Sequence, residues 1–173
     1  NNYQAILLGH FILLRSILIQ TVVFLIIFNG VAMLRETSML SSSGHITPKP
    51  QQLKTMTGED MVLKSNGKKT IVYFFAPWCQ VCNFSIENLQ KVYQKTPDLD
   101  VIAVALDFVD VEEVKKFTAN HQLTFPVALG NEQVKMEYKV MGYPSYYVLN
   151  EENTIISRSL GYSTEIGLYL RTF

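Results

Sequence analysis

The segment Thr70–Cys82, TIVYFFAPWCQVC, determines how the rest of the chain is interpreted. Residues 70–76 form a continuous apolar, β-branched and aromatic run, which is typical of a strand buried on both faces. Helical spacing of apolar residues follows over 79–95, so Cys79 is expected in the first turn of a helix. Unpaired backbone N–H groups and the positive end of the helix dipole favour a thiolate there.

The two cysteines of the chain form a single Cys-x-x-Cys. Cys82 is expected one helical turn beyond Cys79 on the same face, where it can resolve a mixed disulfide formed by the Cys79 thiolate. A structural zinc site needs four ligands, in two such pairs or a pair with spaced histidines. The histidines are isolated from one another and are His10, His45 and His121. Redox chemistry is therefore favoured over a metal site, and also over an inert buried pair.

The sequence around this motif alternates between strand and helix patterns. The expected elements are a short hairpin over 53–63, a strand over 101–106, a helix over 110–120, paired strands over 145–149 and 154–159, and a last helix from a cap at Ser163 to about Arg171. Asp110 and Glu113 have the spacing of a capping box. This order predicts an α/β fold with a mixed sheet.

The N-terminal region is strongly apolar, and from residue 1 to 34 its only charged residue is Arg15. As a helix, the 19 residues of Ser16–Leu34 would span about 28 Å, close to the hydrocarbon thickness of a bilayer. A retained transmembrane helix is favoured, and a cleaved signal peptide is the alternative. Arg15 and Arg35 flank the span, so the positive-inside rule leaves its orientation open.

These features divide the chain into an N-terminal membrane anchor over 1–35, a flexible linker over 36–50 and a globular domain over 51–173. The linker is rich in Ser, Thr, Gly and Pro. Two of the 15 Lys and Arg residues precede Glu36. From Glu36 onward there are 13 Lys and Arg residues and 15 Asp and Glu residues, so the net charge of this part is −2. No basic excess supports nucleic-acid binding.

Four segments carry a resemblance to a known family. They are Val72–Cys82, Val101–Asp107, Leu123–Val127 and Tyr138–Ser145. In order and spacing, residues 52–171 resemble the thioredoxin superfamily, and more closely its bacterial membrane-tethered branch, the TlpA/ResA/ScsD-like disulfide reductases. A Trp-Cys-x-x-Cys joined to a downstream Gly-x-Pro-Ser before a strand is a specific combination.

The resemblance implies a thioredoxin fold, which has a central mixed sheet flanked by helices. It also implies a single-pass protein of the inner (cytoplasmic) membrane whose catalytic domain lies in the periplasm or outside. Electrons would come from a membrane thiol transporter of the DsbD or ScsB kind. The expected activity needs no metal, flavin or nucleotide cofactor.

Three further site residues follow from the resemblance. Pro144 corresponds to the cis-proline that lies against the active-site pair in this family. Tyr143 would line the groove for the substrate, where Thr is frequent in relatives, and its alternative role is packing. Trp78 would cover the disulfide, with a role in the core as the alternative.

The group that accepts the proton of the resolving thiol is left open. Many thioredoxins have a buried carboxylate six residues before the first cysteine, and Tyr73 stands there. Glu87 can accept a proton only if the helix turns its side chain inward, and an ordinary solvated position is favoured. Asp107, at a strand end, is the other candidate.

The expected function is reduction of disulfides in extracytoplasmic partner proteins through a dithiol–disulfide cycle of Cys79 and Cys82. Gln80 and Val81 carry no charge that would strongly stabilise the reduced form, which argues against a very oxidising protein. Two alternatives stay open. The same fold can donate disulfides, since sequence does not set the direction, or the thiolates can handle Cu(I) in an assembly factor.

Overall fold

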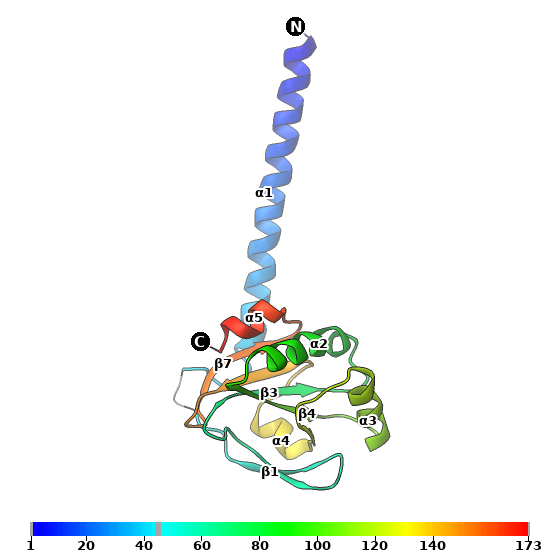
Figure 1. The fold of residues 1–173 in the computed structure, drawn as a ribbon. Coiled ribbons are helices and arrows are strands. Elements are labelled where there is room, and N and C mark those ends of the chain that lie inside the picture. Colours follow the sequence, from blue (N-terminus) through cyan, green and yellow to red (C-terminus); the bar gives the residue numbers. More distant parts are fainter. Residues whose placement is uncertain (1, 44–45, 173) are drawn as a thin grey trace. The chain divides into compact units, whose positions relative to one another are not determined.

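The structure, a computed structural model, describes residues 2–43 and 46–172. It contains two compact units, over residues 1–35 and 36–173, and each is described by itself. The first unit contains all of helix α1 (Asn2–Glu36) except its last residue, and the helix is drawn in blue in Figure 1. Its stretch Leu13–Val31 has a mean hydropathy of 1.9 and no buried residues. Among the described residues, α1 is the one helix long and apolar enough to cross a membrane.

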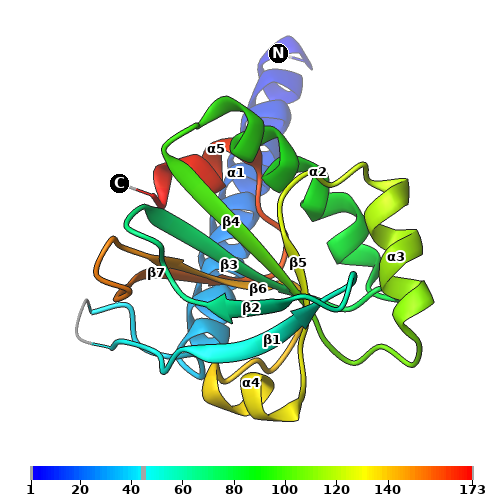
Figure 2. The ribbon, with the colours of Figure 1, turned by 60° about the horizontal axis from the view of Figure 1, so that its bottom comes forward.

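The second unit is built on a seven-stranded sheet in the order β2-β1-β5-β4-β3-β6-β7. The strands are β1 (Gln51–Thr55), β2 (Asp60–Leu63), β3 (Lys69–Phe75), β4 (Leu99–Ala105), β5 (Val127–Leu129), β6 (Ser145–Leu149) and β7 (Ile155–Leu160). β3 pairs in parallel with β4 and antiparallel with β6. The sheet is therefore mixed, as the sequence predicts, and Figure 2 shows its strands side by side.

Helices cover both faces of the sheet (Figures 1 and 2). They are α2 (Gln80–Lys95), α3 (Val111–Asn120), α4 (Glu132–Glu137) and α5 (Glu165–Leu170). On one face, Ile71, Tyr73 and Phe75 of β3 join a core with residues of α2, α3 and α5. On the other face, Val72 and Phe74 pack with residues of α4. Because β3 is buried on both faces, it has the continuous apolar sequence that predicts it.

Two local expectations can be compared with the helix ends. Asp110 is the N-cap of α3, as expected, and its side chain accepts from the backbone N–H of Glu112. The cap of α5 is Thr164 and not Ser163, so that expectation is wrong by one residue. The Ser163 hydroxyl instead lies 2.8 Å from the Tyr146 hydroxyl, and Thr164 Oγ1 accepts from the Gly167 N–H.

The first residues after α1 pack against the sheet. Met39 is 4% exposed and belongs to the core on the α4 face. Arg158 of β7 donates from Nη1 to the carbonyls of Met39 at 3.2 Å and Leu40 at 2.7 Å. The backbone N–H of Leu40 donates to the Tyr147 hydroxyl at 3.1 Å. The segment expected to be a flexible linker over 36–50 therefore contains residues held by the globular unit, which its polar composition does not reveal.

Candidate active site

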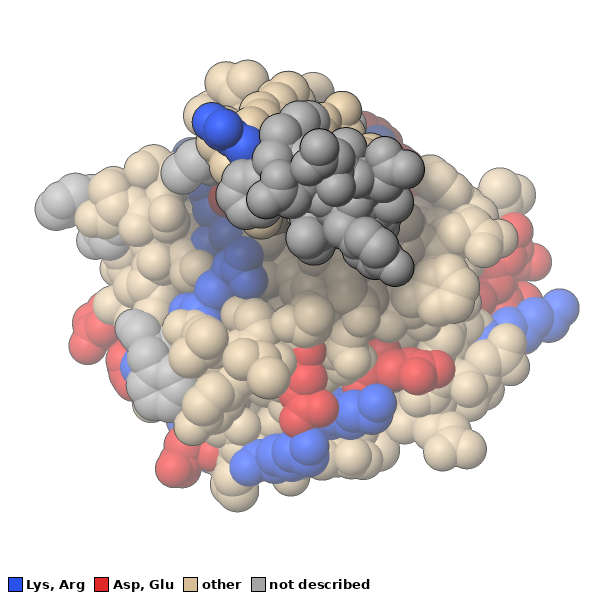
Figure 3. Space-filling model, turned by 90° about the horizontal axis from the view of Figure 1, so that it is seen from above, with Lys and Arg blue, Asp and Glu red and all other residues tan. Residues whose placement is uncertain are grey.

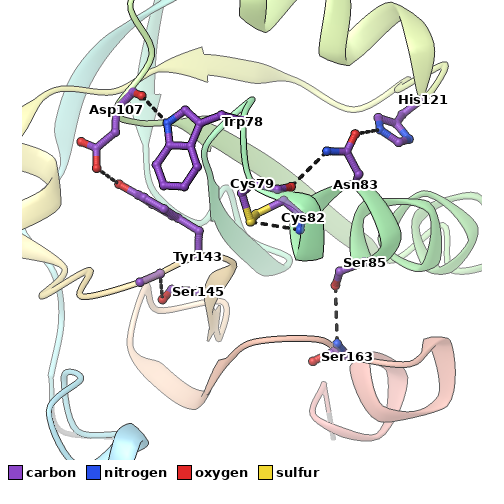
Figure 4. Close-up of a disulfide and its surroundings, with 11 residues drawn as sticks. Trp78, Cys79, Cys82, Asn83, Ser85, Asp107, His121, Tyr143, Ser145 and Ser163 are labelled. Atoms are coloured by element: carbon purple, nitrogen blue, oxygen red, sulfur yellow. Dashed lines mark hydrogen bonds between the residues drawn. A yellow bond between two sulfur atoms is a disulfide. The ribbon is translucent and has the colours of Figure 1, made fainter.

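The Cys79–Cys82 pair lies where β3 gives way to α2 (Figure 4). The two residues form a disulfide, with their Cα atoms 5.2 Å apart. Cys79 is the N-cap of α2, and its Sγ accepts from the backbone N–H of Cys82 at 3.1 Å. One N–H of the first helical turn therefore donates to the Cys79 sulfur at the positive end of the helix dipole, an arrangement that stabilises a thiolate.

The two sulfurs differ in their access to solvent. Cys79 is 6% exposed, whereas Cys82 is fully buried in the core between α2 and the sheet. Solvent therefore reaches the pair through Cys79 and not through Cys82. The burial fits the two roles expected from the sequence, with Cys79 attacking first and Cys82 acting within the protein.

Pro144 follows a cis peptide bond, as the resemblance implies. This bond precedes β6, the strand beside β3, and so lies at the same edge of the sheet as the disulfide. The turn is fixed on both sides of the proline. The Ser145 hydroxyl donates to the Gly142 carbonyl at 2.7 Å, and the N–H of Gly161 donates to the Pro144 carbonyl at 2.7 Å.

Trp78 and Tyr143 form an aromatic wall beside the disulfide (Figure 4). Their rings meet edge to face, with centroids 5.9 Å apart. Both are tied to Asp107, which follows β4. The indole Nε1–H of Trp78 donates to the Asp107 carbonyl at 2.8 Å, and the Tyr143 hydroxyl donates to Asp107 Oδ2 at 2.9 Å. Trp78 remains 62% exposed, so this wall is open to solvent.

Lys135 of α4 completes this network. Its Nζ donates to both carboxylate oxygens of Asp107, at 2.8 and 2.7 Å. Partial burial acts to raise the pKa of Asp107, but the hydrogen bonds from Lys135 and Tyr143 outweigh it and the pKa is lowered. Burial, followed by the Asp107 contact, raises the pKa of Tyr143, so the phenol stays a hydrogen-bond donor.

Asp107 is therefore better suited to positioning than to accepting a proton. Its carboxylate already accepts from two donors, and its lowered pKa makes protonation harder. The backbone of Asp107 has φ +49°, in the left-handed region that Asp tolerates better than most side chains. In this conformation, the Asp107 carbonyl accepts from Trp78 and the Asp107 carboxylate accepts from Tyr143.

A second polar chain lies on the other side of the disulfide. Asn83 donates from Nδ2 to the Cys79 carbonyl at 3.0 Å, and its Oδ1 lies 2.9 Å from Nε2 of His121. The other ring nitrogen of His121 is 3.7 Å from Glu87 Oε1. The Glu87 side chain is 62% exposed, so α2 turns it outward toward His121 and not inward toward Cys82.

Tyr73 occupies the buried position that a carboxylate has in many thioredoxins. It is fully buried in the same core as Cys82. Burial raises the pKa of Tyr73, so the phenol is a poor base at neutral pH. Within the described part of the chain, no group of three or more His, Cys, Asp and Glu residues could hold a metal ion.

Sequence reasoning missed Asn83, Lys135 and the role of His121. Asn83 lies four residues after Cys79, the helical spacing at which a side chain reaches the preceding turn, so this signal was present. Lys135 and His121 come from α4 and from the end of α3, and tertiary packing alone brings them to the site.

The model of the AhpC/TSA family matches residues 45–158 of the chain. The chain belongs to the AhpC/TSA family. This match includes the disulfide-bonded pair and the cis-proline, which are 65 residues apart by number and adjacent in the fold.

Relatives and solved structures agree with this assignment to the AhpC/TSA family. Thioredoxin-like protein YneN of Bacillus subtilis is 31% identical over 118 residues, which are 65% of this chain and 69% of that protein. Sporulation thiol-disulfide oxidoreductase A of the same organism is 31% identical over 114 residues, 63% of this chain and 69% of that one. The crystal structure of StoA from Bacillus subtilis has a TM-score of 0.64 at 27% identity and covers 73% of this chain and 98% of its own.

The family, the fold and the bonded pair make this chain a thiol–disulfide oxidoreductase. The thioredoxin-like fold expected from the sequence is confirmed. The activity of the homologues implies disulfides of partner proteins as substrates.

Proposed function

We propose that the chain is a membrane-anchored reductase of disulfides in partner proteins, with Cys79 as the nucleophile and Cys82 as the resolving thiol. The observation that carries this proposal is the difference in burial between the two sulfurs at the N-terminus of α2. The sulfur that a partner can reach is also the one that the helix terminus favours as a thiolate.

The reaction begins when the Cys79 thiolate attacks one sulfur of the partner disulfide. A bond forms between Cys79 Sγ and that sulfur, and the other partner sulfur leaves as a thiolate and takes a proton. Cys82 then loses its proton and attacks Cys79 Sγ, so the first partner sulfur leaves in turn. Two electrons pass to the partner, which ends as a dithiol, and the Cys79–Cys82 disulfide forms.

Trp78, Tyr143 and Pro144 form the groove that receives the partner. The aromatic wall of Trp78 and Tyr143 supplies apolar contact area beside Cys79. An extended segment of the partner would pass along the chain before Pro144, with its cysteine over Cys79. Asp107 and Lys135 lie outside the reacting atoms and support the wall through Tyr143.

The apolar stretch of α1 supports a single-pass anchor, and we place the catalytic unit on the periplasmic or outer side of the inner membrane. Disulfides persist in such oxidising compartments and are rare in the cytosol. A reductase there needs a supply of electrons, so a membrane thiol transporter of the DsbD or ScsB kind would reduce the Cys79–Cys82 disulfide after each turnover.

Trapping tests the assigned roles. In the full chain, Cys82→Ala should accumulate mixed disulfides with partner proteins, because the partner bound to Cys79 is no longer released. Cys79→Ala, the matched control, should trap none. If Cys79→Ala trapped partners as well as Cys82→Ala does, the assignment of nucleophile and resolving thiol would be wrong.

The reduction potential tests the direction. Equilibration of the full chain with thiol–disulfide buffers should give a value near that of thioredoxin, about −270 mV, for a reductase. A value near −120 mV would instead identify a disulfide donor.

A further inference from the structure

The backbone carbonyl of Cys79 accepts two hydrogen bonds from a single residue. The backbone N–H of Asn83 donates to it at 3.2 Å, and Nδ2 of the same residue donates at 3.0 Å. The first of these is the ordinary bond between residues four apart in a helix. The second is additional to the helix, and it brings another N–H dipole to the residue that carries the exposed sulfur of the pair.

His121 determines which way the amide of Asn83 faces (Figure 4). The Cys79 carbonyl can only accept, so Asn83 turns its NH2 group toward it and its Oδ1 toward Nε2 of His121, 2.9 Å away. An amide oxygen also only accepts, so the proton of this bond is on Nε2. The other ring nitrogen lies 3.7 Å from Glu87 Oε1, beyond hydrogen-bond distance. The hydrogen bond of Nε2 is therefore directed at Asn83.

The imidazole is held in place by contacts other than its bond to Asn83. His121 is the C-cap of α3, where its backbone N–H donates to the Phe117 carbonyl at 3.2 Å. Its ring packs on that of Phe117, with centroids 4.6 Å apart, and its side chain is 11% exposed. Three residues later, Gln90 of α2 donates to the Thr124 hydroxyl at 2.7 Å and accepts from the Thr124 N–H at 3.0 Å. His121 can therefore impose an orientation on the amide.

The contacts of Cys79 favour negative charge on its sulfur. In the thiolate, the partial negative charge of the residue's own carbonyl oxygen opposes the charge on Sγ, and each N–H donated to that oxygen offsets this effect. The chain has a formal net charge of 0, and residues of both signs lie side by side on the face drawn in Figure 3. Local groups, and not an excess of one sign, thus set the potential at the sulfur.

We propose that Asn83 and His121 are positioning residues for Cys79, and that they shift the redox equilibrium of the Cys79–Cys82 pair toward the reduced form. The inference rests on the proposed role of Cys79 as the nucleophile. When two glutathione molecules reduce the disulfide, two electrons pass to the pair and one glutathione disulfide forms. Cys82 takes one of the two glutathione protons, and the other goes to solvent when Cys79 remains a thiolate. Stabilising that thiolate therefore favours reduction of the pair.

Equilibration with glutathione tests this inference. The full chain in detergent is equilibrated at pH 7 with mixtures of glutathione and its disulfide, and the reduced fraction is measured after acid quenching and modification of the thiols. The variants are Asn83→Ala and His121→Leu. The matched control is Asn88→Ala, because Asn88 is the same residue type on the same helix but donates, at 3.0 Å, to the segment 162–163. Alkylation of Cys79 by iodoacetamide as a function of pH gives a second readout.

We expect Asn83→Ala and His121→Leu to shift the equilibrium toward the disulfide about fivefold, which corresponds to a potential about 20 mV more negative. Alkylation of Cys79 at pH 7 should slow several-fold in both, since less of it is thiolate. His121→Gln should stay near wild type, because its side-chain amide can still donate to Asn83. Asn88→Ala should lower the free energy of unfolding and leave both redox readouts unchanged.

Three results would overturn the inference in distinguishable ways. If Asn83→Ala keeps the wild-type equilibrium and alkylation profile, its contact with Cys79 is structural only and this inference fails alone. If His121→Gln shifts the equilibrium as far as His121→Leu, the hydrogen bond to Asn83 is not the cause and the role of His121 is wrong. If Cys82 reacts before Cys79 in wild type, the assignment of the nucleophile fails, and the proposed function with it. His121→Met repeats the measurement should His121→Leu not fold by circular dichroism.

Discussion

The Tyr143 hydroxyl donates to Oδ2 of Asp107 at 2.9 Å, which links the residue before the cis-proline to the second residue after β4. Asp107 also accepts from the Trp78 indole through its backbone carbonyl. Asp107 therefore orients both aromatic side chains beside Cys79. These hydrogen bonds involve neither cysteine sulfur. Under the proposed function, these residues would act in recognition of the partner, and the two cysteines would carry out the exchange reaction.

Asp107→Asn should weaken partner recognition and leave exchange chemistry intact. The amide keeps the size of the side chain but loses the charge that holds Tyr143 and Lys135. We expect kcat/KM for a protein disulfide to fall about fivefold, which corresponds to about 1 kcal/mol, mostly through KM. The rate with a small aromatic disulfide should not change. Glu112→Gln, which breaks the exposed pair with Lys115, is the control and should be neutral. An equal loss with both substrates would contradict a positioning role.

The same carboxylate should give the stability of the protein an acid dependence. The folded pKa of Asp107 is lowered from an unfolded value near 3.9. Such a group stabilises the folded state above its unfolded pKa, and this contribution is lost as the pH falls through the folded pKa. Urea unfolding of the full chain in detergent should therefore give a larger free energy of unfolding for wild type than for Asp107→Asn above about pH 5. This difference should shrink as the pH falls below that value. A difference in free energy of unfolding that does not change with pH would rule out ionisation of Asp107 as its cause.

Alkylation of the reduced protein should be selective. Cys79, at a helix N-terminus, retains 6% exposure, whereas Cys82 is fully buried. We expect a bulky maleimide to modify Cys79 at least about tenfold faster than Cys82 at neutral pH. Peptide mapping after a short reaction with the maleimide measures the alkylation of each cysteine. In protein unfolded by urea, the two alkylation rates should be similar. Comparable rates in the folded protein would mean that the reduced state opens to expose Cys82.

Removal of the hydroxyl from two buried tyrosines, Tyr138 and Tyr147, should change the free energy of unfolding in different ways. The Tyr138 hydroxyl has no hydrogen-bond partner among the described residues, whereas that of Tyr147 donates to the Tyr138 carbonyl at 2.6 Å and accepts from Leu40. Tyr138→Phe should leave the free energy of unfolding unchanged or raise it, because an unsatisfied buried group costs about 1–3 kcal/mol. Tyr147→Phe should lower it by about 1–2 kcal/mol. Denaturant unfolding measures both, and a large loss for Tyr138→Phe would reveal a partner for its hydroxyl.

The sequence predicts the parts of this site that local physics determines. The buried strand β3 and the cysteine at the start of α2 follow from one continuous segment, Thr70–Cys82, so both were found. β5 and α4 were missed, because three and six residues are too few to show a period.

The contacts among Lys135, Asp107 and Tyr143 join three separate elements, and no spacing along the chain encodes them. The packing of Met39 was hidden for another reason. Its surroundings are polar enough to suggest a linker, and its burial depends on the position of Arg158, more than a hundred residues away.

The burial of Cys82 directly behind Cys79 also determines how the reduced protein would withstand oxidants. A peroxide that reaches the site meets Cys79 first and converts its thiolate to a sulfenic acid. Cys82 is held one helical turn away and can condense with that sulfenic acid, with loss of water, before a second oxidant molecule arrives. The product is the ordinary disulfide of the catalytic cycle and not an irreversible sulfinic acid. Oxidation of Cys79 would thus end in a form that the proposed electron donor can reduce.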